Sequence, residues 1–158
     1  QNNEPNPGSS ASPTEEAPAS ESSPVPSPTE QAMPPERVKA LEKAITQFIH
    51  VYYHRDSSLT KEDLQERLSP LVTSSFLLRH PIDLSTESDQ WVYENNAVIE
   101  ASVTILGGDL GITPTRARVP IEVTIVGKAD GQSTHPYVVS VHIEAVWQNG
   151  QWRIEELG

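Results

Sequence analysis

His50 and His54 have a spacing that is typical of metal binding. Residues four apart lie on the same side of a helix, and two histidines so placed can supply half of a zinc site. The apolar residues of this segment recur on the opposite side of the predicted helix, however, and no third ligand stands at a fixed spacing. The sequence contains no cysteine, which removes thiolate ligands and thiolate nucleophiles. We therefore expect two solvent-exposed histidines, and we predict no metal site and no cofactor.

Glu156 is the one carboxylate that the strand pattern places in phase with predicted inward residues, namely Trp152 and Ile154. A carboxyl group among apolar side chains is a candidate general acid or base. This one lies near a sheet edge, where water reaches it, so we expect no catalytic role. The other predicted inward residues cannot titrate: Val38, Ile45, Phe48, Ile99, Val103, Ile121, Val123, Val139, Val141 and Ile143. The sequence therefore predicts no catalytic residue and a protein that is not an enzyme.

Two further features have a chemical and a structural interpretation. Tyr52, Tyr53 and Tyr93 could line the mouth of a pocket, but packing of aromatic rings at the rim of a core is the simpler interpretation. Residues 107–111, with the sequence Gly-Gly-Asp-Leu-Gly, follow a predicted strand but open no helix and contain no lysine. They predict a mobile hairpin connection and not a phosphate-binding loop.

The elements that must position these residues begin with a helix. It is predicted to start at Pro34 and Pro35, which are tolerated at a helix start, and to run to about Arg55. A second helix is predicted to start at Thr60, with Asp63 at the third helical position in a capping-box pattern. The apolar residues of the first helix recur at three- and four-residue steps and form one stripe: Val38, Leu41, Ile45, Phe48, Ile49 and Tyr52.

A third, short helix is predicted between Ser69 and His80, because Pro70 cannot continue the second helix without a kink. Residues 81–90 are interpreted as a loop, and a weak strand is expected around residues 91–93. Alternating apolar residues then predict several strands. Helices followed by strands indicate an α+β fold, with three N-terminal helices packed on a bent antiparallel sheet of about four strands.

The predicted strands cover residues 97–105, 119–125, 137–147 and 151–155, the last two joined by a tight turn at Asn149 and Gly150. This turn predicts three cross-strand pairs: Trp147 with Trp152, Ala145 with Ile154, and Glu144 with Glu155. Arg116, Arg118 or Arg153 is expected to offset the two like charges. A tight turn at Asp130 and Gly131 would put the apolar faces of its two strands out of register. A bulge is therefore expected near Gly127 or Pro136.

The outward face of the predicted sheet mixes charged residues with exposed valines. The candidate surface for self-association or partner binding consists of Arg116, Arg118, Glu122, Val138, Ser140, His142, Glu144 and Arg153, with Thr124 and Val146 on the same face. An ordinary solvated sheet face is the alternative.

The first 35 residues differ in composition from the rest. They contain nine of the 14 prolines, five glutamates and no lysine, arginine or aromatic residue, which predicts a disordered tether. The other 123 residues, 36–158, suffice for one domain with one core. The net charge of −11 argues against binding to nucleic acid or to an anionic membrane surface. No run of residues is apolar enough to span a membrane. Because the chain starts at Gln1 and not at Met, and because a stalk of Pro, Ser, Thr and Glu usually connects two parts, we expect a signal sequence or an anchor upstream of Gln1.

Four segments carry a resemblance to a known family: residues 48–53 (Phe-Ile-His-Val-Tyr-Tyr), 64–68, 71–76 and the final Trp-Arg-Ile-Glu at 152–155. With the order of elements, they resemble the nuclear transport factor 2-like cone fold. The helical half looks most like the extracytoplasmic domains of conjugation proteins of the TcpC type, Gram-positive relatives of the membrane-anchored scaffold of type IV secretion systems. The resemblance implies assembly, with outer domains that self-associate and contact other channel components.

We therefore expect a non-enzymatic scaffold module on the outer, cell-surface or cell-wall side of a membrane. It would be anchored in the full-length protein, would form a homo-oligomer and would bind protein partners of an envelope assembly. One alternative is a carrier or sensor that holds a small ligand in the cone cavity. A small cone-fold enzyme is the other, and it would need a buried Asp or His that the strand phase misses.

Overall fold

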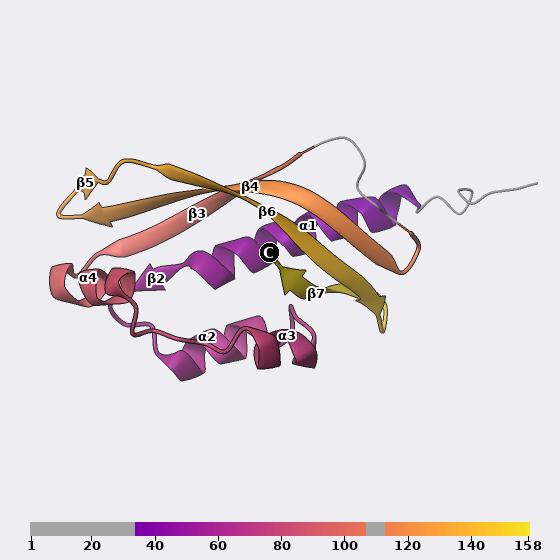
Figure 1. Cartoon of the computed structure of the whole chain (residues 1–158), viewed down its shortest axis with the longest axis horizontal. Coiled ribbons are helices and arrows are strands. Elements are labelled where there is room, and N and C mark those ends of the chain that lie inside the picture. Colours follow the sequence, from indigo (N-terminus) through magenta and orange to yellow (C-terminus); the bar gives the residue numbers. More distant parts are fainter. Residues whose placement is uncertain (1–33, 107–112) are drawn as a thin grey trace, which may run out of the picture.

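The computed structural model of this chain describes residues 34–106 and 113–158. Apart from Pro34 and Pro35, the predicted tether lies outside the described residues, and so does the predicted glycine-rich connection at residues 107–111. The described part contains four helices and a six-stranded antiparallel sheet. This arrangement confirms the predicted α+β class with helices packed on a bent sheet (Figure 1).

The helices follow the predicted starts in two of four cases. Helix α1 (Pro35–Tyr53) has a proline at its first position and buries Leu41, Ile45, Phe48 and Ile49, four residues of the predicted stripe. Helix α2 (Lys61–Leu68) is capped by Thr60, whose side chain and backbone exchange hydrogen bonds with Asp63 in the predicted capping box. Phe48 packs edge-on against Phe76, with ring centroids 5.4 Å apart, and so joins α1 to α3.

Two helix predictions were wrong. Helix α3 (Ser74–Arg79) begins four residues later than predicted, with Thr73 in place of Ser69 as its cap. Ser69 instead closes α2 by donating its N–H to the carbonyl of Gln65. Helix α4 (Glu87–Asn95) occupies the segment predicted as loop and weak strand. Its start has the same capping box as α2, formed by Thr86 and Asp89. Three consecutive apolar or aromatic residues at 91–93 were too few to distinguish a strand from a helix.

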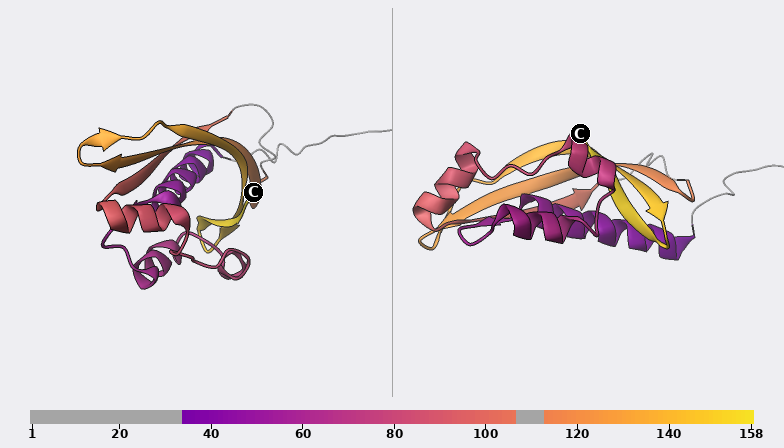
Figure 2. Two further views of the ribbon diagram at one scale, coloured as in Figure 1. Left: turned by 60° about the vertical axis from the view of Figure 1, so that its left-hand side comes forward. Right: turned by 90° about the horizontal axis from the view of Figure 1, so that it is seen from below.

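The sheet contains β2 (Arg55–Asp56), β3 (Val98–Ile105), β4 (Arg116–Ala129), β5 (Gln132–Ser133), β6 (Tyr137–Gln148) and β7 (Gln151–Leu157). The order is β2-β3-β4-β6-β7, and the short β5 pairs with β4. The two-residue strands β2 and β5 are additions to the four predicted strands. The sheet curls around α1, which packs against β3 and β7, while α4 lies at one end of the arch (Figure 2).

The predicted bulge between the long strands is present. Ile125 pairs with Tyr137, and Lys128 pairs with Ser133. Between these pairs, residues 126–127 of β4 face the three residues 134–136, so the second segment contains one extra residue. The extra residue brings the apolar faces of β4 and β6 onto the same side of the sheet.

The last hairpin has the predicted turn, since Asn149 and Gly150 both adopt positive φ. The pairs Trp147 with Trp152 and Ala145 with Ile154 are confirmed. The prediction that Glu144 faces Glu155 was wrong, because a bulge at this point makes Glu156 the partner of Glu144. The same bulge takes Glu156 out of phase with Ile154 and places Leu157 opposite the buried Ile143.

Candidate functional site

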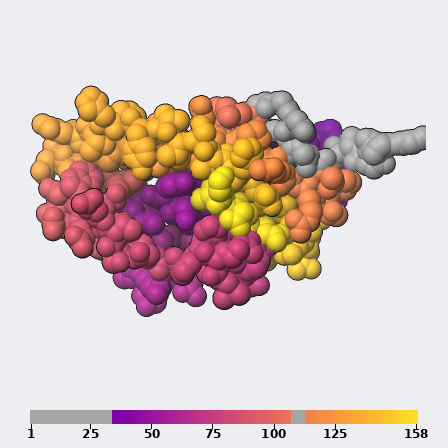
Figure 3. Space-filling view, viewed as in Figure 1, coloured from indigo at the N-terminus to yellow at the C-terminus, as the bar shows by residue number. Residues whose placement is uncertain are grey.

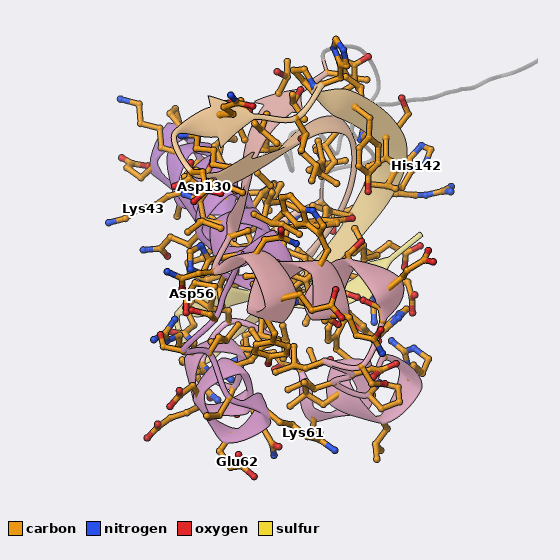
Figure 4. All side chains as sticks on the ribbon, turned by 90° about the vertical axis from the view of Figure 1, so that its left-hand side faces the viewer. Lys43, Asp56, Lys61, Glu62, Asp130 and His142 are labelled. Carbon is orange, nitrogen blue, oxygen red and sulfur yellow. The ribbon has the colours of Figure 1, made fainter. Side chains whose placement is uncertain are left out.

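The outward face of the sheet brings the predicted surface residues together. Cross-strand register places Arg118 beside Glu144, and Glu122 beside Ser140. His142 lies opposite Pro120 and points outward from the convex side of the sheet (Figure 4). Seven of the eight predicted residues occupy this stretch of β4 and β6: Arg116, Arg118, Glu122, Val138, Ser140, His142 and Glu144.

The charges on this face are paired loosely. A nitrogen of Arg116 lies 3.5 Å from Glu155, and one of Arg118 lies 3.9 Å from Glu144. Both arginine side chains are more than half exposed. Ion pairs of this kind contribute about 0–1 kcal/mol to stability, so both guanidinium groups remain accessible to a partner.

Two residues of the predicted face have a structural role. Arg153 is half-buried, and its guanidinium lies 3.4 Å from the carbonyl oxygen of Val72 and 3.5 Å from that of Ser69. It therefore ties β7 to the segment that follows α2. Val146, expected to be exposed, is buried between its cross-strand neighbours Arg116 and Arg153. Long arginine side chains cover apolar neighbours in this way.

A cavity of about 320 Å³ lies between α4, the end of α1 and the sheet. Figure 3 shows the corresponding hollow between the strands and the helices, with α1 behind it. Four aromatic residues line the cavity: Tyr52, Tyr53, Trp91 and Tyr137. Gly127 lies at its wall, where a Cβ atom would come within 3.0 Å of the Trp91 ring. A side chain at this position would therefore displace Trp91.

The polar side of the cavity is an ion pair. The Nε of Arg55 donates to Asp89 at 3.1 Å, and another guanidinium nitrogen donates to the carbonyl of Tyr52 at 2.8 Å. The second carboxylate oxygen of Asp89 accepts from the N–H and the hydroxyl of Thr86. The Asp89 side chain is only 4% exposed. Both charges are thus engaged within the fold, and the pair joins α4 to the end of α1.

Three residues of this cavity, Arg55, Asp89 and Trp91, were not predicted from the sequence to line a pocket. Asp89 and Trp91 fell in a segment predicted as loop and strand, and Arg55 was predicted only as the end of a helix. The signal was present, because Thr86 stands three residues before Asp89, as Thr60 stands before Asp63.

The three tyrosines were predicted either to line a pocket mouth or to pack at the rim of the core, and the structure separates them. Tyr52 and Tyr53 line the cavity, whereas Tyr93 lies outside it and donates to the carbonyl of Leu59 at 3.2 Å. Burial, with smaller contributions from the neighbouring Tyr52 and Tyr137, raises the pKa of Tyr53 to about 12. Burial also raises the pKa of Tyr52, against the lowering effect of the Arg55 charge. Both hydroxyl groups therefore stay protonated at neutral pH.

The remaining candidate residues are engaged in local contacts. His50 is exposed as expected, but His54 is half-buried and bonds Asp56 at 2.8 Å. Glu156 bonds Arg79 and His80, both at 2.7 Å, which joins the end of α3 to β7. His80 first, and then Arg79, hold the pKa of Glu156 below its usual value. Within residues 34–106 and 113–158, no three His, Cys, Asp or Glu side chains are placed to hold a metal ion. None of the helices in this part combines the length and the apolar character that a membrane span requires.

Comparison with known proteins gives structural likeness only. No protein-family model and no curated protein matches the sequence. The structure is similar to that of an IcmL-like type IV secretion system protein from Legionella pneumophila. The two share 14% identity and a TM-score of 0.58 over 80% of this chain and 93% of that one. CagV, a VirB8 homolog of the type IV secretion system of Helicobacter pylori, matches with 14% identity and a TM-score of 0.51, over 76% and 95% of the two chains. This chain thus shares the nuclear transport factor 2-like fold of these proteins.

Proposed function

We propose that this chain is a non-enzymatic assembly module of an envelope secretion machine of the type IV class. The observation that supports the proposal is that the fold of this chain matches more than nine-tenths of the solved chains of two type IV secretion proteins. In this proposal the domain lies outside the cytoplasm, at the end of the Pro/Ser/Glu-rich segment of residues 1–35. That segment connects it to a membrane anchor in the full-length protein.

The outward face of β4 and β6 is the proposed contact surface. It offers two accessible guanidinium groups, on Arg116 and Arg118, and the exposed Val138 lies further along β6 on the same face. Charged groups around exposed apolar area are typical of the polar rim of a protein interface. A homo-oligomer and contacts with other components of a Gram-positive conjugation channel, as in TcpC-type proteins, are the finer form of the proposal.

An assembly role fits the chemistry of the cavity better than catalysis does. Asp89 is the buried carboxylate that a cone-fold enzyme would need, but Arg55 and Thr86 already occupy it. A general base needs a lone pair directed at the substrate. The Asp89 carboxylate already accepts one hydrogen bond on Oδ1 and two on Oδ2.

Site-specific photocrosslinking in native membranes tests the proposal. A crosslinking amino acid at Arg118 or His142 of the full-length protein should capture a second copy or a secretion component, identified by mass spectrometry. The same amino acid at Glu66, exposed on α2, serves as the matched control. Equal capture from all three positions, or none from the sheet face, would contradict a partner surface there.

A second candidate function is transport or sensing of a small ligand. The aromatic cavity of about 320 Å³ supports it, since ligand pockets are mostly apolar with few polar groups. Native mass spectrometry of the purified chain tests this candidate: a reproducible added mass that Trp91→Ala abolishes supports it, and the bare polypeptide mass argues against it.

A further inference from the structure

Among the residues that the structure describes, strand β6 is covered along only part of one edge. On one side, its residues from Tyr137 to Val146 pair with β4. On the other side, β7 reaches only as far as Gly158, which exchanges two backbone hydrogen bonds with His142 at 2.8 and 3.0 Å. In the part of the chain that the structure describes, no strand pairs with residues 137–141 on this second side.

The direction of the backbone groups follows from the pairing. In an antiparallel ladder, the N–H and C=O of successive residues point alternately to the two sides. Those of His142 point toward Gly158, so those of Ser140 and Val138 point the same way. Pro120 lies opposite His142 on β4 and has no N–H to donate. This is consistent with backbone groups of His142 that point away from β4. Val138 and Ser140 therefore present two donors and two acceptors to the open side.

The composition of this edge favours pairing. Residues 137–141 read Tyr-Val-Val-Ser-Val, with no charge, proline or glycine. Exposed edges in stable proteins are usually protected by lysine, proline or a bulge. Tyr137 and Val138 are 59% and 54% exposed, two of the four most exposed large apolar residues described.

The open edge adjoins the cavity. Tyr137 belongs to both, because its side chain lies on the concave side of the sheet and lines the cavity. A strand added to β6 would lie about 4.8 Å away, and every second side chain of it would face the same concave side. Figure 3 shows the hollow directly beside this part of the sheet. A large apolar side chain on the added strand would enter the cavity.

We propose that residues 137–141 of β6 bind an extended peptide of a partner protein. The peptide adds as an antiparallel strand in line with β7 and places one large apolar side chain in the cavity beside Trp91. Backbone hydrogen bonds supply affinity in this mode of recognition, and the pocket supplies specificity. A second copy paired through the same edge about Val139 would place its Tyr137 beside Val141, away from the cavity. The proposed edge site uses the backbone of β6, whereas the convex contact surface uses side chains of β4 and β6, and the two share Val138 and Ser140. The edge site does not depend on the proposed secretion role.

The test starts from a phage-displayed library of random twelve-residue peptides, selected on the full 158-residue chain. We expect binders that share one large apolar residue. Their synthetic versions should slow amide exchange of Val138 and Ser140 at least about tenfold, because both N–H groups become hydrogen-bonded. In the free monomeric chain the same two amides should exchange fast.

Matched variants separate the edge from the cavity. Ser140→Pro removes an open-side donor without removing a bond of the sheet, and should weaken binding about tenfold. Ser140→Ala keeps the N–H and should stay within about twofold. Ser88→Trp, at the cavity wall, should also weaken binding about tenfold, whereas Gln90→Trp, an exposed control on α4, should not. N-methylation of the peptide amides that face β6 repeats the edge test on the unaltered protein.

Three results would overturn the proposal. The first is a library that yields no peptide with a Kd below about 100 µM. The second is slow exchange of Val138 and Ser140 in the free monomer, which would show that the chain itself covers the edge. The third is protection that appears only as the chain dimerises, which would assign the edge to a second copy.

Discussion

Arg55 and Asp89 form an ion pair across 34 residues of sequence, with Nε and Oδ1 3.1 Å apart and the carboxylate almost fully buried. The pair joins the short strand after α1 to the start of α4. Buried charges are tolerated when their hydrogen bonds are complete, and here Thr86 satisfies the second carboxylate oxygen. This contact therefore helps to fix the position of α4 at the aromatic cavity, together with the buried Val92 and the hydrogen bond from Tyr93 to the Leu59 carbonyl.

Replacing Asp89 by Ala should lower the free energy of unfolding by about 3 kcal/mol, since it leaves Arg55 without its ion-pair partner and removes the Asp89 half of the capping box. Asp63→Ala is the matched control. It removes the same capping contact from α2, but Asp63 has no ion-pair partner among the described residues, and the expected loss is about 1 kcal/mol. Urea unfolding measures both. Equal losses in the two variants would show that the ion pair adds nothing to the cap.

Asp56 should give the domain an acid-sensitive contribution. Hydrogen bonds from Ser58, and then from His54, lower the pKa of Asp56 from 3.8 to about 2. Because the folded pKa lies below the unfolded one, the stabilisation is complete above about pH 4 and is lost as the pH falls toward 2. Asp56 is partly exposed, so we expect a contribution of about 1 kcal/mol. The free energy of unfolding should fall between pH 6 and pH 2 in both proteins, and the fall should be about 1 kcal/mol smaller in Asp56→Asn than in the unaltered chain.

A carbon-13 titration of the Asp56 carboxyl group checks the cause directly. Ser58→Ala should raise its pKa more than His54→Asn does, because the Ser58 hydroxyl makes the largest contribution. A carboxyl group that titrates near pH 4 in the unaltered chain would contradict the prediction.

Local sequence signals predicted α1, the start of α2 and the final hairpin, because each depends on residues close together in the chain. The capping box of Thr60 and the positive φ of Asn149 and Gly150 are of this kind. The bulge that places Glu156 opposite Glu144 was not predicted, since it depends on how β7 meets Arg79 and His80 of another element.

The outward face of the sheet and the aromatic cavity also differ in whether local sequence could predict them. The outward face could be predicted as a set, because alternation along β4 and β6 fixes which side chains share a face. The cavity could not, because α4, α1 and the sheet form it together. The one local clue was the capping pattern at Thr86, which carries no information on what α4 packs against.

The outward face should contain both accessible and structural arginines. Arg118→Ala should change the free energy of unfolding by less than about 0.5 kcal/mol, because its pair with Glu144 is long and exposed. Arg153→Ala should cost about 1 kcal/mol, since it removes donors from the carbonyls of Ser69 and Val72. If Arg118 proves the more important for stability, its role is structural, and the proposed contact surface loses a central residue.

Arg37 should fasten the first turn of α1 to the far end of the sheet. Its guanidinium lies 4.1 Å from the centre of the Trp147 ring and donates to the carbonyl of Pro114 at 2.6 Å. Its own carbonyl accepts from the indole N–H of Trp152 at 3.0 Å. Arg37→Ala should therefore lower the free energy of unfolding by about 1–2 kcal/mol.

Arg37→Lys tests which of these contacts matters. Lysine keeps the positive charge but lacks the planar group that stacks on an indole and donates sideways at the same time. The backbone carbonyl of residue 37 remains in both variants, so the Trp152 hydrogen bond should persist, and tryptophan fluorescence should report mainly the change at Trp147. We expect stability midway between the unaltered chain and Arg37→Ala in urea unfolding. If the lysine variant is as stable as the unaltered chain, the positive charge of residue 37 is sufficient and the planar guanidinium group adds nothing.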